Sequence, residues 1–287
     1  MKIEKYKVSD GKDFSLDDFA TNDKGGYKNK DEALSDMNKN IEKIESEQDK
    51  LYAQNQKSVL LIIQAMDAAG KDGLIKHVMT GLNPQGTQVF SFKQPSAEEL
   101  DHDFLWRYNK SLPERGRIGI FNRSYYEDVL VVKVHNLIEV NQYPYNKVND
   151  KFWYNRYEHI KNYEKYLYDN GIIPVKIFLN VSKDEQKERF MSRLNDSSKN
   201  WKFSIADVKE RAYWNEYQKA YQDAISATAS EIAPWYIIPA DKKWFARLLV
   251  SEIFLHILKG MNLEYPQISK EESARLADAK KALEEEK

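Results

Sequence analysis

The chain has 287 residues, of which 41% are hydrophobic and 31% are charged, and it contains no cysteine. This composition predicts a globular protein with a sizeable core, and it excludes disulfides, a thiolate nucleophile and any metal site that depends on cysteine. With 44 Lys and Arg against 45 Asp and Glu, the net charge of −1 argues against a broadly basic nucleic-acid-binding surface. The N-terminus has no apolar signal segment and no run approaches 18 apolar residues, so we expect a cytoplasmic protein without nucleic-acid or membrane partners.

Five short apolar runs alternate with long amphipathic stretches, a pattern typical of a parallel sheet with crossover helices. The runs are apolar on both faces, as strands covered by helices on both sides require. They occupy residues 58–64, 88–92, 117–121, 172–181 and 235–238. Residues 31–56 predict an amphipathic leading helix, and the charged stretch from about 269 predicts a solvated or disordered tail. Because no linker or internal repeat interrupts the chain, we expect a single domain over residues 1–287.

Helix-capping signals lie on both sides of the fourth apolar run, residues 172–181, and one more occurs earlier in the chain. Ser96 with Glu99, and Ser182 with Glu185, have the spacing of a capping box, in which two side chains satisfy each other's free backbone donors. Gly171 predicts the end of a long aromatic helix. Helices are therefore expected on both sides of residues 172–181.

The most informative segment, AMDAAGKDG (65–73), follows the first predicted strand. Gly70 allows the backbone to approach an anion, and Lys71 would open a helix whose free N–H groups point at that anion. The pattern departs from G-x-x-x-x-G-K-[ST] at Ala65 and Asp72. A carboxylate at Asp67 can face phosphates only with a cation between them, which predicts a Mg²⁺-linked or reactant-orienting group. The alternative is an ordinary glycine-capped turn.

The third predicted strand ends in Asn122 and Arg123, and Glu127 and Asp128 follow one turn later. Ligands of open α/β sheets lie beyond the carboxyl ends of strands, so this turn should lie beside the phosphate loop. A P-loop enzyme usually carries Asp where Asn122 stands, and Glu127 or Asp128 could supply the missing carboxylate. Arg123 can bind phosphate bidentately. The alternative for Arg123 and Glu127 is a surface ion pair.

A third charged cluster, residues 183–202, carries six Lys or Arg and four Asp or Glu. Arg189 and Arg193 are four residues apart and project from one helix face. We interpret residues from about 183 to 215 as a lid that closes over a phosphotransferase site and excludes water. A solvated helix face is the alternative.

With these clusters in place, the chain resembles the polyphosphate kinase 2 family from about residue 31 to residue 260. The similarity is closest to the subgroup with Asn after the third strand, which is associated with phosphorylating nucleoside mono- and diphosphates. It implies an α/β, three-layer P-loop kinase fold of the thymidylate-kinase type, with a five-stranded parallel sheet and a helical lid. The stretches that carry it are QAMDAAGKDG (64–73), GLNPQGTQVFSFKQPSAEELDHDFLWR (81–107), IGIFNRSYYEDVLVVKVHN (118–136), VSKDEQKERFMSRL (181–194) and APWYIIPADKKW (233–244).

The resemblance also implies transfer of phosphate from inorganic polyphosphate to AMP, ADP or other nucleotides, as in ATP regeneration. It implies Mg²⁺, with Mn²⁺ as a substitute, and a homo-oligomer, either a dimer or a tetramer. It assigns metal binding to Asp67 and Asp128. The expected catalytic residues are Asp67, Lys71, Asn122, Arg123 and Arg189. Together with the loop pattern, it predicts that polyphosphate or nucleotide binds to Ala68, Ala69, Gly70, Lys71, Asp72, Gly73, Lys93, Arg123, Glu127, Arg189 and Arg193.

An acceptor phosphate oxygen is already ionised at neutral pH, so no strong general base is needed and catalysis would consist of alignment and charge neutralisation. Two other functions stay open at this point. One is an ATP-dependent nucleoside monophosphate kinase, and the other is a non-catalytic regulator that binds polyphosphate or nucleotide. Conversion of AMP to ATP with polyphosphate as the sole donor would separate these functions.

Overall fold

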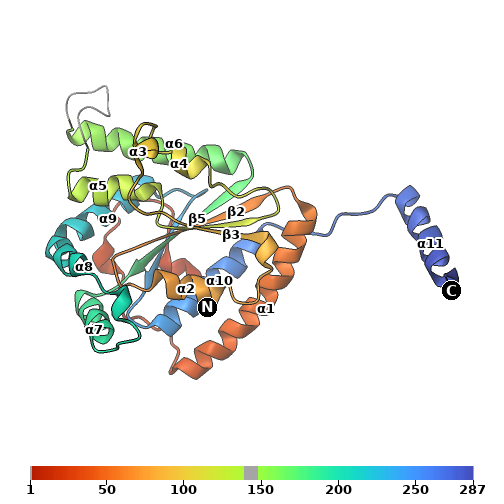
Figure 1. Ribbon diagram of the computed structural model, residues 1–287, viewed down its shortest axis with the longest axis horizontal. Helices are drawn as coiled ribbons and strands as arrows, with labels where there is room; N and C mark the ends of the chain where they lie inside the picture. Colours follow the sequence, from red (N-terminus) through yellow and green to blue (C-terminus); the bar gives the residue numbers. More distant parts are fainter. Residues whose placement is uncertain (1, 139–147, 287) are drawn as a thin grey trace.

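The computed structural model describes residues 2–138 and 148–286 and shows a six-stranded sheet between two groups of helices (Figure 1). The strands lie in the order β1-β6-β5-β2-β4-β3, and every neighbouring pair except β1 and β6 is parallel. Their bounds are β1 Lys7–Val8, β2 Ser58–Ala65, β3 Thr87–Ser91, β4 Ile118–Asn122, β5 Ile172–Asn180 and β6 Trp235–Pro239.

All five predicted strands are present, but the predicted count of five strands was too low. The additional strand, β1, pairs with β6 through only two residues, and two residues carry no periodicity that a sequence pattern can reveal. β2 lies in the middle of the sheet and is buried at all eight positions, as the apolar run predicted. β3 pairs with β4 alone, and its Val89 is 50% exposed.

One face of the sheet is covered by α1, α2 and α10, and the other face by α5, α6 and α9 (Figure 1). The bounds of these six helices are α1 Lys30–Gln54, α2 Lys71–Val78, α5 Val131–Val134, α6 Asp150–Asp169, α9 Trp214–Thr228 and α10 Lys243–Gly260. The other helices are α3 Ala97–Leu100, α4 Trp106–Asn109, α7 Lys183–Leu194, α8 Ile205–Glu210 and α11 Lys270–Glu285. α7 and α8 form the segment that we interpreted as a lid.

The leading helix α1 runs along α10 and is held by one stripe of buried residues. Asn29 caps its start by accepting hydrogen bonds from the N–H groups of Asp31 and Glu32, and Asn55 ends it in the left-handed conformation. The stripe recurs every three or four residues, as one face of a helix requires. Its members are Ala33, Met37, Asn40, Ile44, Gln48 and Leu51.

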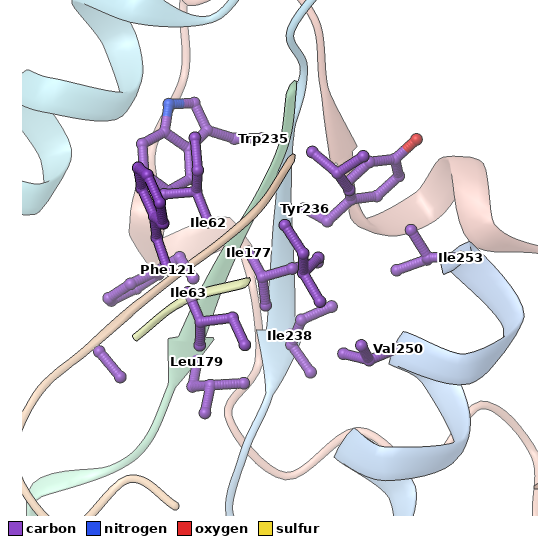
Figure 2. Close-up of a cluster of buried hydrophobic side chains, with 14 of the residues drawn as sticks. Ile62, Ile63, Phe121, Ile177, Leu179, Trp235, Tyr236, Ile238, Val250 and Ile253 are labelled. Carbon is purple, nitrogen blue, oxygen red and sulfur yellow. The ribbon is translucent and has the colours of Figure 1, made fainter. Parts of the chain in front are cut away.

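The core lies on both sides of the sheet (Figure 2). On one side of β6, Tyr236 and Ile238 lie toward Val250 and Ile253 of α10. Trp235 lies on the other side and packs edge-to-face on Tyr126, with ring centroids 4.6 Å apart. Core packing on this side therefore reaches the turn that follows β4.

The predicted capping signals had mixed outcomes. Gly171 has a φ of +85° just after α6, and the capping box at Ser96 and Glu99 is complete. The box at Ser182 is only half formed: Ser182 accepts a hydrogen bond from the N–H of Glu185, but the Glu185 carboxylate accepts a bond from Arg189 instead of returning to Ser182. The N–H of Ser182 donates to Asp241. Asp241 therefore takes the place of Glu185 as the acceptor for the N–H of Ser182.

The predicted tail forms α11, which stands apart from the rest of the molecule at the end of an extended segment (Figure 1). Its described side chains are exposed. Across the described parts of the chain, no helix combines the length and the apolar character needed to cross a membrane.

Candidate phosphate-binding site

The loop between β2 and α2 has the shape of an anion cradle. Gly70, at the start of α2, has a φ of +111°, a conformation that glycine adopts without strain. Ala68 takes a φ of +58° in the same loop. Ala65, where the motif has its first glycine, is the last residue of β2 and pairs with Leu179 of β5. The loop begins one residue later, so position 65 needs no glycine.

Lys71 folds back over this loop. Its Nζ donates to the carbonyl oxygens of Ala65 at 2.9 Å and Met66 at 3.4 Å. Burial lowers the pKa of Lys71, and the positive charge of Arg123 lowers it further. An anion in the loop would oppose both effects, so the site favours a ligand that brings negative charge.

The turn after β4 lies against the phosphate loop and is joined to it by Arg123. Nη2 of Arg123 lies 2.9 Å from Oδ1 of Asp67, and Nη1 lies 3.2 Å from Oε2 of Glu127. Burial alone would lower the pKa of Arg123, but the two carboxylates more than offset it and raise that pKa. Arg123 also has a φ of +66°, which is rare for a residue with a side chain and typical of functional turns.

Asn122 connects the first turn of α2 to the edge strand. Its Nδ2 donates to Oδ1 of Asp72 at 2.9 Å and to Oγ of Ser91 at 3.3 Å. Asp72, which stands where the motif has Ser or Thr, is thus held by the strand-end amide.

Two carboxylates of the site have oxygen atoms without a partner in the part of the chain that the structure describes. Asp128 has no hydrogen bond or ion pair there, and Oδ2 of Asp67 also has none. Burial raises the pKa of Asp128 to about 7, although Arg156 acts in the opposite direction. No three His, Asp or Glu side chains gather around a metal-sized space within residues 2–138 and 148–286. One or two carboxylates completed by phosphate oxygens suit Mg²⁺, so Asp67 and Asp128 fit that ion.

Arg189 lies against the backbone of the phosphate loop, and its five N–H donors all have protein acceptors. Nη1 donates to the carbonyl oxygens of Ala68 and Ala69 at 3.1 and 2.6 Å. Nη2 donates to those of Ala240 and Asp241, and Nε donates to Glu185. The predicted phosphate contact would require Arg189 to give up some of these bonds. In this structure it holds the loop.

A cleft of about 1590 Å³ lies over both loops and under the α7–α8 segment, and every residue of the predicted site lines it. Lys93 is exposed at its wall. Nη1 of Arg193 lies 3.7 Å from Oδ2 of Asp207. Residues that are far apart in the sequence therefore share one space.

A buried polar network supports the turn after β4. Glu164 of α6 accepts hydrogen bonds from the hydroxyls of Tyr125 at 3.1 Å and Tyr126 at 2.7 Å. Lys176 of β5 lies 2.7 Å from the same carboxylate, and both charged side chains are at most 1% exposed. The Tyr126 hydroxyl also lies 2.9 Å from Oγ1 of Thr228. Loss of Glu164 or Lys176 would leave the other charge buried and unpaired, so the pair is strongly held. Because Tyr125 and Tyr126 are hydrogen-bonded to Glu164, the network also fixes the turn that carries Arg123.

Several cleft residues were missed by the sequence analysis. Lys243 and Arg247 of α10 line the cleft, as do His135, Glu210 and Tyr217. Nε2 of His135 lies 2.9 Å from Oε2 of Glu210, which links α5 to α8. The rule that ligands lie beyond strand ends, applied to the turn after β6, would have pointed to Lys243. No sequence signal identified His135.

Comparisons with known proteins agree with this geometry. The family described as Polyphosphate kinase 2 (PPK2) matches residues 27–266. The chain is 48% identical to an ADP-polyphosphate phosphotransferase of Rhodopseudomonas palustris, over 93% of each chain. It is 44% identical to an AMP/ADP-polyphosphate phosphotransferase of Meiothermus ruber, over 92% of this chain and 96% of the relative. The crystal structure of polyphosphate kinase 2 from Arthrobacter aurescens superposes with a TM-score of 0.85 at 39% identity, over 94% of this chain and 95% of that one.

Proposed function

The chain belongs to the polyphosphate kinase 2 family and is a polyphosphate-dependent nucleotide phosphotransferase, and we propose that it phosphorylates both AMP and ADP with Mg²⁺ as its metal. The observation that carries this proposal is the Asp67–Arg123 ion pair, which joins the phosphate loop to the turn after β4 within one cleft. Asn122 at the end of β4 supports the choice of both acceptors. So do the names of the R. palustris and M. ruber relatives.

The reaction moves one phosphoryl group. An oxygen of the terminal nucleotide phosphate forms a bond to the end phosphorus of polyphosphate, while the bond from that phosphorus to the bridging oxygen breaks. The shortened polyphosphate leaves with the electron pair. The attacking oxygen is ionised at neutral pH, so the residues of the site align two anions and reduce their repulsion.

Lys71 and Arg123 supply the positive charge in this scheme. Lys71 would exchange its two carbonyl acceptors for phosphate oxygens, which are stronger acceptors because they are charged. Arg123 is positioned by Asp67 and Glu127, so its remaining N–H groups meet the phosphates without a search through rotamers. Arg189 would act as a positioning residue by holding the loop carbonyls.

Enzymes that transfer phosphoryl groups generally need a divalent metal, and we assign Mg²⁺ to Asp67 and Asp128. When bound, Mg²⁺ would supply charge neutralisation on the phosphate oxygens. The two carboxylates would hold it on the protein side, because Oδ2 of Asp67 and the Asp128 carboxylate have no partner among the described residues.

A luminescence assay tests the function directly. The protein is incubated with AMP or with ADP, long-chain polyphosphate and Mg²⁺, with no ATP added. We expect ATP from both acceptors. ATP from ADP alone would contradict the dual acceptor, and AMP turnover that requires ATP as donor would contradict polyphosphate as the donor. Binding of both ligands without product would exclude catalysis.

A further inference from the structure

Two basic side chains of the cleft have no role in the function proposed so far. Lys243 and Arg247 occupy the first two turns of α10 and, four residues apart, share one helix face. Arg247 approaches the phosphate loop closely: a Cβ placed on Gly73, in the first turn of α2, would lie 3.4 Å from Nη2 of Arg247. The pair therefore continues the cleft wall from the start of α2 along α10.

Neither side chain has a hydrogen bond or an ion pair with any residue in the described parts of the chain. This distinguishes them from Arg123, which has two carboxylate partners, and from Arg189, whose donors are all used. Partial burial lowers the pKa of Lys243, as do the positive charges of Arg189, Arg247 and Arg193, with Glu185 acting in the opposite direction. Burial also lowers the pKa of Arg247.

The balance of charge around Lys71 differs from that around Lys243. Asp67, Glu127 and Asp72 are the carboxylates that act on Lys71. Among the described residues, the carboxylate that acts on the pKa of Lys243 is Glu185, which is already paired with Arg189. Positive charge in excess in the wall of a cleft attracts an anion and is stabilised by it.

We propose that Lys243 and Arg247 form a second anion subsite, which holds the part of the polyphosphate chain beyond its reacting end. The inference rests on the proposed function, because that function supplies a donor whose charge continues past the phosphate loop. AMP and ADP carry one or two phosphates, which must reach the transferred group between Lys71 and Arg123. Polyphosphate, in contrast, has further phosphates beyond the one that is transferred.

The test compares Lys243→Met and Arg247→Met with the wild type in steady-state kinetics, with the donor and the nucleotide varied separately. Each loss of a charge-assisted contact should raise KM for long-chain polyphosphate about tenfold. KM for the nucleotide and kcat should not change. With tetraphosphate as donor, the effect should shrink, because a short donor has fewer phosphates that can occupy the subsite. Lys242→Met is the matched control, since Lys242 is the preceding residue and lies outside the cleft lining.

Binding measurements separate this inference from the function itself. Long-chain polyphosphate is titrated into nucleotide-free protein by calorimetry, so the result does not depend on turnover. Weaker binding by Lys243→Met and Arg247→Met, restored by Lys243→Arg and Arg247→Lys, supports the subsite even if no ATP forms in the assay above. Unchanged polyphosphate affinity in both variants, or a rise in nucleotide KM alone, overturns it. In the second case the two side chains would bind nucleotide phosphates.

Discussion

In the mechanism that we propose, charge neutralisation depends on Lys71 and Arg123. We expect Lys71→Ala or Arg123→Ala to lower kcat with polyphosphate at least about a hundredfold, because one positioned arginine is worth about 10³–10⁵ in related phosphoryl transfer. The measurement is initial ATP formation at saturating substrates, with circular dichroism as the test of folding. Lys76→Ala, an exposed lysine of α2 outside the cleft lining, is the control. Near-normal kcat in either site variant would remove that residue from the mechanism.

Asp128 offers a prediction about stability. Its pKa rises from 3.8 to about 7 in the folded protein, so ionisation opposes folding, and stability is lost as the pH rises from about 4 to about 7. In chelator and at pH 8, Asp128→Asn should raise the free energy of unfolding by about 2 kcal/mol. Each pKa unit corresponds to about 1.4 kcal/mol, and water in the open cleft reduces the effect.

Urea unfolding at several pH values checks this prediction for Asp128. The gap between variant and wild type should grow between about pH 4 and pH 7 and stay constant above that range. A gap that does not depend on pH would mean that Asp128 ionises normally. If Asp128 binds the metal as we propose, the same variant should lose activity, because an amide cannot replace the charge of the carboxylate.

From the sequence, individual site residues could be predicted where they follow the end of a strand. Lys71 begins the helix that follows the loop after β2, Arg123 comes directly after β4, and both line the cleft. Sequence reasoning could not foresee that Arg189 would use all five donors, since helix spacing gives a direction but not the carbonyl groups of a loop about 120 residues away. Nor could it separate core from cleft aromatics. Tyr125 and Tyr126 directly follow the cleft residues of the turn after β4, yet they are fully buried against Glu164.

Among the elements, the phosphate loop departs from its motif at Ala65, and the structure gives the reason. Position 65 is a buried strand residue, so restoring glycine should gain nothing. We expect Ala65→Gly to leave kcat within about twofold and to lower the free energy of unfolding by about 1 kcal/mol, because glycine weakens a strand interior. Urea unfolding and the ATP assay measure both effects. A clear gain in kcat would show that a methyl group at this position restricts the loop.

Elements with a strong local pattern could be predicted and weak ones could not. The central strand β2 is buried on both faces, which is what its apolar run indicates. The antiparallel edge strand β1 exists because β6 offers it a partner, and that partner lies more than 200 residues away. The half-formed box at Ser182 has the same origin, since Arg189 and Asp241 compete for its groups.

At the scale of the whole molecule, α11 adds length without adding to the core. Every described side chain from Glu264 onward is exposed. Deleting residues 269–287 should therefore leave the thermal midpoint within about 1 °C and kcat unchanged, because no buried surface is lost. Differential scanning calorimetry and the ATP assay test this. Light scattering on the same pair shows whether the expected homo-oligomer depends on the tail, and a midpoint lower by several degrees would mean that α11 packs on the protein.

The fold and family could be predicted from the whole chain because five ordered stretches agree with one another, each at the end of a strand or the start of a helix. The charge pattern of the cleft needed the structure. Lys243 and Arg247 matter through what surrounds them, and that environment comes from α2, α7 and α10 together.

The hydrogen bonds of Arg189 also limit how the α7–α8 segment could move. An outward rotation of the whole of α7 would break the hydrogen bonds between the Arg189 guanidinium and the loop carbonyl groups. Each buried group left without a partner would cost about 1–3 kcal/mol. After α8, Arg211 donates hydrogen bonds to the first turn of α7, at the carbonyl oxygen of Lys183 and the side-chain oxygen of Gln186. If the segment opens to admit substrates, we therefore expect the movement to lie between these two arginines and to include α8. The phosphate loop would then keep its shape.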